Sequence, residues 1–130
     1  MLSRKITIAL ILLCAIFVFV PGCYKDRTVV TAAPEITRTV TFSQDIIPIF
    51  NKSCNNSGCH SAGGQVPNLT EASAYNSLTI GGYVNKDNPE LSILYLKVSG
   101  QKGTPMPPSG ANKDYAALIL AWIKQGANNN

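Results

Sequence analysis

The residues best suited to chemistry lie in one short segment, Cys54-Asn55-Asn56-Ser57-Gly58-Cys59-His60. This segment contains two thiols and the only histidine among the 130 residues of the chain. Thiol sulfurs form covalent bonds and bind metals, and a neutral imidazole is the commonest metal ligand among side chains. The spacing therefore predicts that Cys54, Cys59 and His60 act together on one bound group.

The order of these three residues is close to a known attachment signature. In Cys-x-x-Cys-His, the two cysteines attach a c-type haem and the histidine binds its iron. Here four residues separate the cysteines instead of two. Five positions along a regular α-helix correspond to a rotation of about 140°, which would turn the two sulfurs away from a common porphyrin edge. We therefore expect a bulge in which Gly58 and its Asn and Ser neighbours form turns.

A second iron ligand is expected from Met106, the only methionine after the initiator. It lies in the segment Thr104-Pro105-Met106-Pro107-Pro108. A thioether opposite a histidine raises the reduction potential of haem iron. The three prolines fix φ and remove backbone donors, which lowers the entropy cost of holding one side chain at a metal. We expect Met106 to bind the iron on the side opposite His60.

The first residues of the chain have the character of an export signal. Two basic residues, Arg4 and Lys5, precede a run over residues 6–20 that is apolar except for Thr7. That run has the length of a secretory signal core and is short for a membrane span. The following Val20-Pro21-Gly22-Cys23 resembles the bacterial lipobox, in which cleavage before the cysteine is coupled to lipid attachment on its sulfur. An ordinary signal peptide with a chance cysteine is the alternative.

These signals predict a lipoprotein signal peptide over residues 1–22, which includes Cys14, and a lipidated Cys23. Residues 23–39 lack helical periodicity and would form a flexible tether between the lipid and a folded domain. The mature protein would be exported and anchored through its lipid to a bacterial membrane, facing the periplasm or the cell surface. In that oxidising compartment Cys54 and Cys59 should be bonded to each other, to haem or to a metal.

Charge argues against nucleic acid as a partner. Loss of residues 1–22 removes Arg4 and Lys5, so nine basic and seven acidic residues remain and the net charge falls from +4 to +2. No dense Lys/Arg run remains in the mature chain. An electrostatic footprint for a phosphate backbone is therefore missing from this sequence.

The hydrophobic pattern predicts helices separated by loops and no sustained strand. The first helix would begin with Ser43 as its N-cap, and Pro48 would either open its regular part or kink it. We expect further helices over residues 70–78, over residues 88–99 with a start at Asn88-Pro89-Glu90, and over residues 113–125 with Gly126 as the stop. Residues 55–69 and 101–111 would be loops, and the tail 128–130 would be disordered.

Together these motifs resemble a class I c-type cytochrome, in particular the small single-haem domains of exported bacterial proteins. The resemblance rests on Ile-x-Pro-Ile-Phe at residues 46–50, the Cys54–His60 motif, the Met-Pro-Pro loop and Trp122-Ile123 in the terminal helix. It covers residues 40–127 and implies an all-α, small cytochrome c-like fold around one covalent haem, with long irregular loops.

The resemblance also implies the roles of the site residues. Cys54 and Cys59 would form the thioethers, His60 would be the proximal ligand and Met106 the distal ligand. The first and last helices would cross near the haem and bring Phe50 close to Trp122. No arginine follows Arg38, so the haem propionates would be met by Lys97, Lys102, Trp122, tyrosines, backbone N–H groups or water.

Three functions fit this pattern. The first is a membrane-anchored carrier of single electrons that is not an enzyme and that works with redox partner proteins. The second is an exported structural or binding module with a Cys54–Cys59 disulfide and no haem. The third is a haem sensor or peroxidase in which Met106 is a displaceable ligand. A structural zinc site is disfavoured because two thiolates and one imidazole leave it one ligand short.

Overall fold

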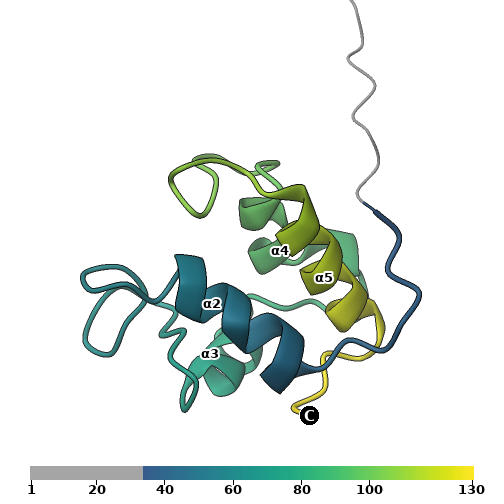
Figure 1. The fold of residues 1–130 in the computed structure, drawn as a ribbon, viewed down its shortest axis with the longest axis horizontal. Helices are drawn as coiled ribbons and strands as arrows, with labels where there is room; N and C mark the ends of the chain where they lie inside the picture. Colours follow the sequence, from purple (N-terminus) through teal and green to yellow (C-terminus); the bar gives the residue numbers. More distant parts are fainter. Residues whose placement is uncertain (1–33) are drawn as a thin grey trace, which may run out of the picture. The chain divides into compact units, whose positions relative to one another are not determined.

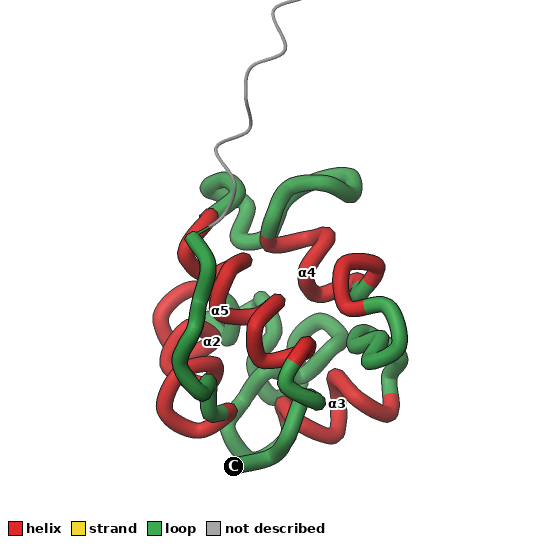
Figure 2. Tube along the Cα trace, turned by 90° about the vertical axis from the view of Figure 1, so that its right-hand side faces the viewer, coloured by secondary structure: helices red, strands yellow, loops and turns green. Residues whose placement is uncertain are grey.

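The computed structural model describes residues 34–130. The expected signal peptide 1–22, Cys23 and the first part of the tether lie outside the described residues. Within the described residues the chain forms helices and loops without any strand, so the all-α class predicted from the sequence is confirmed (Figure 2). No helix in this same part combines the length and the apolar character needed to cross a membrane.

Short helices surround the core and long loops join them (Figure 1). The loop after α2 and the loop between α4 and α5 are the longest stretches without a helix, as the sequence predicted for residues 55–69 and 101–111. The helical elements are η1 (Phe42–Ile46), α2 (Ile47–Ser53), α3 (Ala74–Ile80), η2 (Pro89–Leu91), α4 (Ile93–Val98) and α5 (Lys113–Lys124).

The first helix begins at a different cap from the one predicted. Thr41 is the N-cap of η1, and its hydroxyl accepts a hydrogen bond from the Gln44 amide at 3.3 Å. The Thr41 amide in turn donates to the Asp45 carboxylate at 2.8 Å, which satisfies a further free N–H at this helix start. Pro48 lies at the first turn of α2, where its missing N–H costs no α-helical bond, so it opens the regular helix.

The helix predicted over residues 88–99 is broken in two. Ser92 separates η2 from α4 with an extended ψ of 129°. Its buried hydroxyl accepts from the Asn85 amide at 2.9 Å and lies 3.3 Å from the Asn85 carbonyl, to which it donates. Serine side chains that bond to backbone in this way compete with helical hydrogen bonding. The break also leaves Leu91 exposed.

An aromatic cluster links the first helix to the last. The Phe42 ring lies 5.1 Å from Trp122, 6.3 Å from Phe50 and 5.4 Å from Tyr75, measured between ring centroids. Phe42 and Trp122 are almost fully buried. The sequence prediction placed Phe50 near Trp122, whereas the recorded ring contacts of both residues run through Phe42. The side chain that joins η1 to α5 is therefore Phe42.

Replacing Phe42 with alanine should destabilise the fold strongly. Truncation of a buried phenylalanine typically costs about 3–5 kcal/mol, and this ring contacts three other aromatic rings. Urea denaturation followed by tryptophan fluorescence measures the change through Trp122. Leu91→Ala is the control, because that side chain is 63% exposed and should change stability by less than about 0.5 kcal/mol. Equal stabilities of the two variants would contradict the packing described here.

The C-terminal tail departs from the predicted disorder. The indole N–H of Trp122 donates to the Asn128 carbonyl at 2.9 Å. The amides of Phe42 and Ser43 donate to the side-chain and main-chain oxygens of Asn130, both at 2.9 Å. These amides open η1 and have no partner within the helix, so the tail supplies the acceptors that they need. The C-terminus accordingly lies beside the start of the first helix (Figure 1).

The chain is also fastened before residue 40, the predicted start of the domain. The half-buried side chain of Ile36 packs against the core. The Gln125 side chain donates to the Arg38 carbonyl at 3.0 Å and accepts from the Val40 amide at 2.9 Å. Arg38 pairs with Asp45 at 2.6 Å. The described end of the predicted tether therefore belongs to the folded unit.

Candidate functional site

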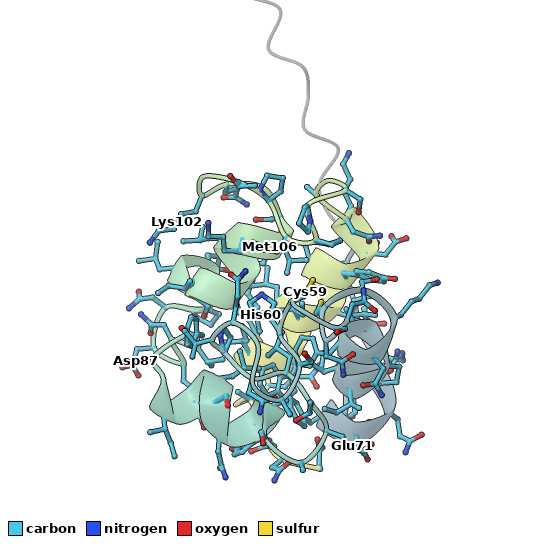
Figure 3. The ribbon with its side chains drawn as sticks, turned by 90° about the vertical axis from the view of Figure 1, so that its left-hand side faces the viewer. Cys59, His60, Glu71, Asp87, Lys102 and Met106 are labelled. Carbon is cyan, nitrogen blue, oxygen red and sulfur yellow. The ribbon has the colours of Figure 1, made fainter. Side chains whose placement is uncertain are left out.

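One cavity gathers all four residues that the sequence selected as cofactor ligands. Its empty volume is about 990 Å³, including the open mouth. Cys59, His60 and Met106 lie together at the centre of the same face of the molecule (Figure 3). The other lining residues are mainly apolar. They include Val66, Pro67, Leu69, Leu78, Tyr83, Ile93, Leu94, Val98, Pro107 and Pro108.

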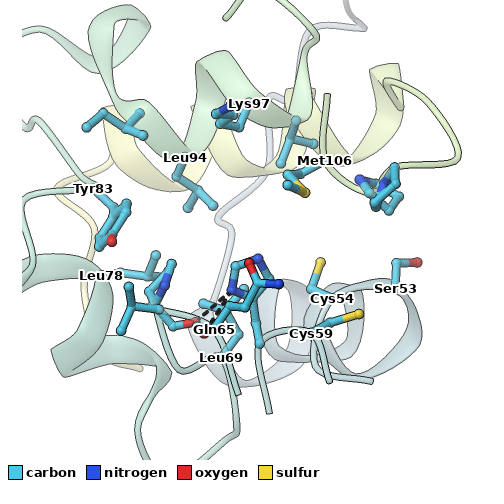
Figure 4. A pocket seen from close by; sticks show the side chains of 17 residues that line it. Ser53, Cys54, Cys59, Gln65, Leu69, Leu78, Tyr83, Leu94, Lys97 and Met106 are labelled. Carbon is cyan, nitrogen blue, oxygen red and sulfur yellow. Dashed lines mark hydrogen bonds between the residues drawn. The ribbon is translucent and has the colours of Figure 1, made fainter. Parts of the chain in front are cut away.

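The cavity has two facing walls and two different ends. Leu94, Lys97 and Met106 form one wall, and Gln65, Leu69 and Leu78 lie on the other (Figure 4). Tyr83 lies at one end, whereas the sulfurs of Cys54 and Cys59 lie toward the other end (Figure 4). This arrangement is a slot with apolar walls, which suits a flat and largely apolar group.

The cysteine segment bulges as its spacing predicted. Helix α2 ends at Ser53, and the amides of Cys54 and Asn55 both donate to the Phe50 carbonyl at 2.9 Å. Gly58 has a φ of +79°, a conformation that glycine adopts without strain. The chain thus leaves the helix and turns back before Cys59, which lets both sulfurs reach the same cavity.

The two thiols have different surroundings. Cys54 is half-buried and its sulfur lies 3.9 Å from the Ile49 carbonyl, whereas Cys59 is exposed. Burial, with a smaller contribution from Cys59, raises the pKa of the Cys54 thiol to about 11, so this thiol stays protonated at neutral pH. Both cysteines are free thiols in the structure.

Backbone carbonyls fix the orientation and the tautomer of His60. Its Nδ1 lies 3.0 Å from the Pro67 carbonyl oxygen and 3.3 Å from that of Gln65. Carbonyl oxygens only accept hydrogen bonds, so Nδ1 carries the proton and Nε2 keeps its lone pair. Within residues 34–130 the recorded hydrogen bonds of the ring involve Nδ1 alone. A ring held in this way is prepared to bind a metal through Nε2.

The loop that supplies those carbonyls is itself closed tightly. The Gln65 amide donates to the Cys59 carbonyl at 2.6 Å, and the Leu69 amide donates to the His60 carbonyl at 2.8 Å. A side chain at Gly64 would collide with the Cys59 carbonyl, so glycine is needed for this approach. Neither Gly64 nor Pro67 was selected from the sequence. Two adjacent glycines soon after His60 were the only local signal of this turn.

The loop that carries Met106 is hydrogen-bonded to the end of α4. The last carbonyls of a helix accept no hydrogen bonds from amides of the same helix, so their donors must come from elsewhere. Here successive carbonyls of α4 accept hydrogen bonds from amides of the loop that follows. The bonds run from Gln101 to Leu96 at 2.9 Å, from Met106 to Lys97 at 2.9 Å and from Asn112 to Val98 at 3.2 Å.

The structure reduces the set of side chains that could donate hydrogen bonds to the haem propionates. Trp122 does not line the cavity, and its N–H already donates to Asn128. Lys102 is exposed and also lies outside the lining. Lys97 and Tyr83 line the cavity and are the side-chain donors of the predicted set that reach it.

Two further findings bear on the nature of the site. Among residues 34–130, no three or more His, Cys, Asp or Glu side chains converge to hold a metal ion. No protein-family model, curated protein or solved structure matches the chain.

Proposed function

We propose that this protein is a c-type cytochrome that carries single electrons through one covalently bound haem. The observation that supports this most strongly is the placement of His60 and Met106 in one apolar slot. His60 Nδ1 donates hydrogen bonds to the carbonyls of Gln65 and Pro67, and Gln65 lies on the wall opposite Met106 (Figure 4). An imidazole lone pair and a thioether on facing walls are the donor set of a six-coordinate haem iron.

The shape and polarity of the cavity suit the same group. Cofactor sites are usually lined mostly by apolar side chains with a few placed polar groups. The slot has this kind of lining. Tyr83 places a polar group at the end of the slot away from the two sulfurs, and a porphyrin carries its propionates away from its vinyl groups.

The thiols at one end suit covalent attachment. A thioether forms when a thiol adds across a vinyl double bond, with sulfur bonding to one carbon and hydrogen to the other. This addition is redox-neutral, so the attachment step itself needs no oxidant. Cys54 and Cys59 would each provide one such bond, and the bulge at Gly58 accommodates the wide spacing between them.

The remaining chemistry is one-electron exchange. A bound haem supplies an iron that alternates between two oxidation states. With His60 and Met106 on the iron, no open position is left for a substrate. His60 is the only histidine of the chain and is used as a ligand, so no histidine remains for acid–base catalysis. Lipidation of Cys23 would hold this carrier at a membrane beside its redox partner proteins.

Intact mass of cysteine variants tests the attachment. The protein is produced with export and haem-attachment machinery, then denatured. We expect the wild-type mass to exceed that of the polypeptide by one haem. Cys54→Ala and Cys59→Ala should each retain haem through the other sulfur, and the double variant should release it. Ser57→Ala, an exposed position in the same segment, is the control and should match the wild type.

The same measurement separates the alternative of a disulfide module. A wild-type mass lower than that of the reduced polypeptide by two hydrogens, without haem, would support a Cys54–Cys59 disulfide and overturn the proposal. Retention of haem by the double cysteine variant after denaturation would contradict the assigned thioethers.

A further inference from the structure

We propose that Lys97 is a positioning residue that fastens the Met106 loop to α4 and thereby keeps Met106 on the iron. This inference rests on the function proposed above and extends it. Lys97 lies in the last turn of α4, is half-buried and lines the cavity. Lys97 is not one of the proposed iron ligands, so we derive its role from the groups that it contacts.

Lys97 contacts the Met106 loop through both its backbone and its side chain. Its carbonyl accepts the Met106 amide at 2.9 Å. Its ammonium Nζ donates to the Thr104 carbonyl at 3.3 Å. These two bonds hold the chain on either side of Pro105, immediately before the ligand side chain.

The loop has few donors with which to hold itself. Pro105, Pro107 and Pro108 have no N–H, so most of the backbone around Met106 cannot donate a hydrogen bond. The Lys97 ammonium supplies the Thr104 carbonyl with a donor from outside the loop. Gly103 has a φ of +58°, a backbone conformation that glycine adopts without strain, in the turn just before Thr104.

The charge of Lys97 strengthens this attachment. Hydrogen bonds from an ionised donor are roughly twice as strong as those between neutral groups. Without the ammonium, the backbone bond from Met106 to Lys97 remains but the Thr104 side of the loop is released. We infer that the loop would then open more often and leave the sixth position of the iron free.

Lys97→Leu is the decisive variant, because it keeps an apolar side chain in the cavity wall and removes the charged donor without adding a group that could bind iron. Lys102→Leu is the matched control: it removes a lysine charge from the Met106 loop, at an exposed position outside the cavity lining. Lys97→Arg should rescue the wild-type behaviour because it restores a cationic donor. All are studied as mature, haem-loaded proteins.

Carbon monoxide binding by the reduced protein at neutral pH measures how often Met106 leaves. We expect an apparent affinity about tenfold higher in Lys97→Leu than in the wild type, as one lost hydrogen bond of ordinary strength would give. The sulfur-to-iron absorption band of the oxidised protein should weaken in parallel. Lys102→Leu and Lys97→Arg should behave like the wild type.

Hydrogen exchange of the Met106 amide supplies a readout that does not depend on the iron. This amide donates to Lys97 in the closed loop, so its exchange rate reports opening. We expect roughly tenfold faster exchange in Lys97→Leu than in Lys102→Leu.

Two failures can be told apart. If the wild-type protein holds no covalent haem, the proposed function fails and the role of Lys97 fails with it. If haem is present and Lys97→Leu matches Lys102→Leu in carbon monoxide affinity and in exchange, only the role of Lys97 is overturned. A Lys97→Leu protein with altered potential but unchanged loop opening would likewise assign the ammonium to the propionates and overturn the proposal.

Discussion

Replacing His60 with alanine is expected to abolish the normal haem spectrum of the protein. His60 is the single imidazole of the chain, and its Nδ1 is bonded to carbonyls so that Nε2 remains free to bind. No other side chain of this type can take its place. The absorption spectrum of the purified oxidised and reduced protein measures the effect.

Gln65→Ala is the matched control for this substitution. Gln65 contacts His60 through its backbone carbonyl, which alanine retains. This variant should keep the wild-type band positions. A wild-type spectrum in His60→Ala would show that the imidazole does not bind the iron, and the assigned proximal ligand would be wrong.

Replacing Met106 with alanine should leave the haem covalently attached and lower its reduction potential. A thioether stabilises reduced iron more than oxidised iron, so its loss favours the oxidised state. Each tenfold change in that preference is worth about 59 mV for one electron. A hundredfold preference would therefore lower the midpoint by roughly 120 mV, measured by spectroelectrochemical titration.

Thr104→Ala controls for disturbance of the loop in that experiment. The Thr104 contact with Lys97 uses the backbone carbonyl, so the alanine variant keeps it. Its midpoint should remain within a small fraction of the shift expected for Met106→Ala. An unchanged potential in Met106→Ala would count against Met106 as the distal ligand.

The helices and loops were predictable wherever the signal is local in sequence. The final helix was predicted over residues 113–125 and runs over Lys113–Lys124. Gly58 was expected to support a turn, and it has positive φ. Apolar periodicity and glycine conformation depend on neighbouring residues, which the sequence displays directly.

The features that were missed depend on residues far apart in the chain. The break at Ser92 requires Asn85 to reach its hydroxyl. The ordered tail requires Phe42 to donate to Asn130, across most of the domain. Hydrophobic periodicity carries no information about such pairings, so the sequence predicted a continuous helix and a disordered end.

The candidate site was likewise predictable only in part. Cys54, Cys59, His60 and Met106 were selected by side-chain chemistry, and the structure places all four on one cavity. Their supporting contacts were not predicted: Pro67 bonds to His60 through its backbone carbonyl, and Lys97, which the sequence suggested only for the propionates, accepts the Met106 amide through its own. Every residue has a backbone carbonyl, so residue type does not reveal which carbonyl accepts such a bond. The lipid anchor at Cys23 lies outside the described residues and stays a prediction.

The most direct test of the central claim is a pyridine haemochrome spectrum of the full-length protein, produced in cells that attach haem to exported proteins. The account predicts the spectrum of a haem joined by two thioethers, with one haem for each polypeptide. A colourless protein, or pigment that organic solvent extracts completely, would contradict it.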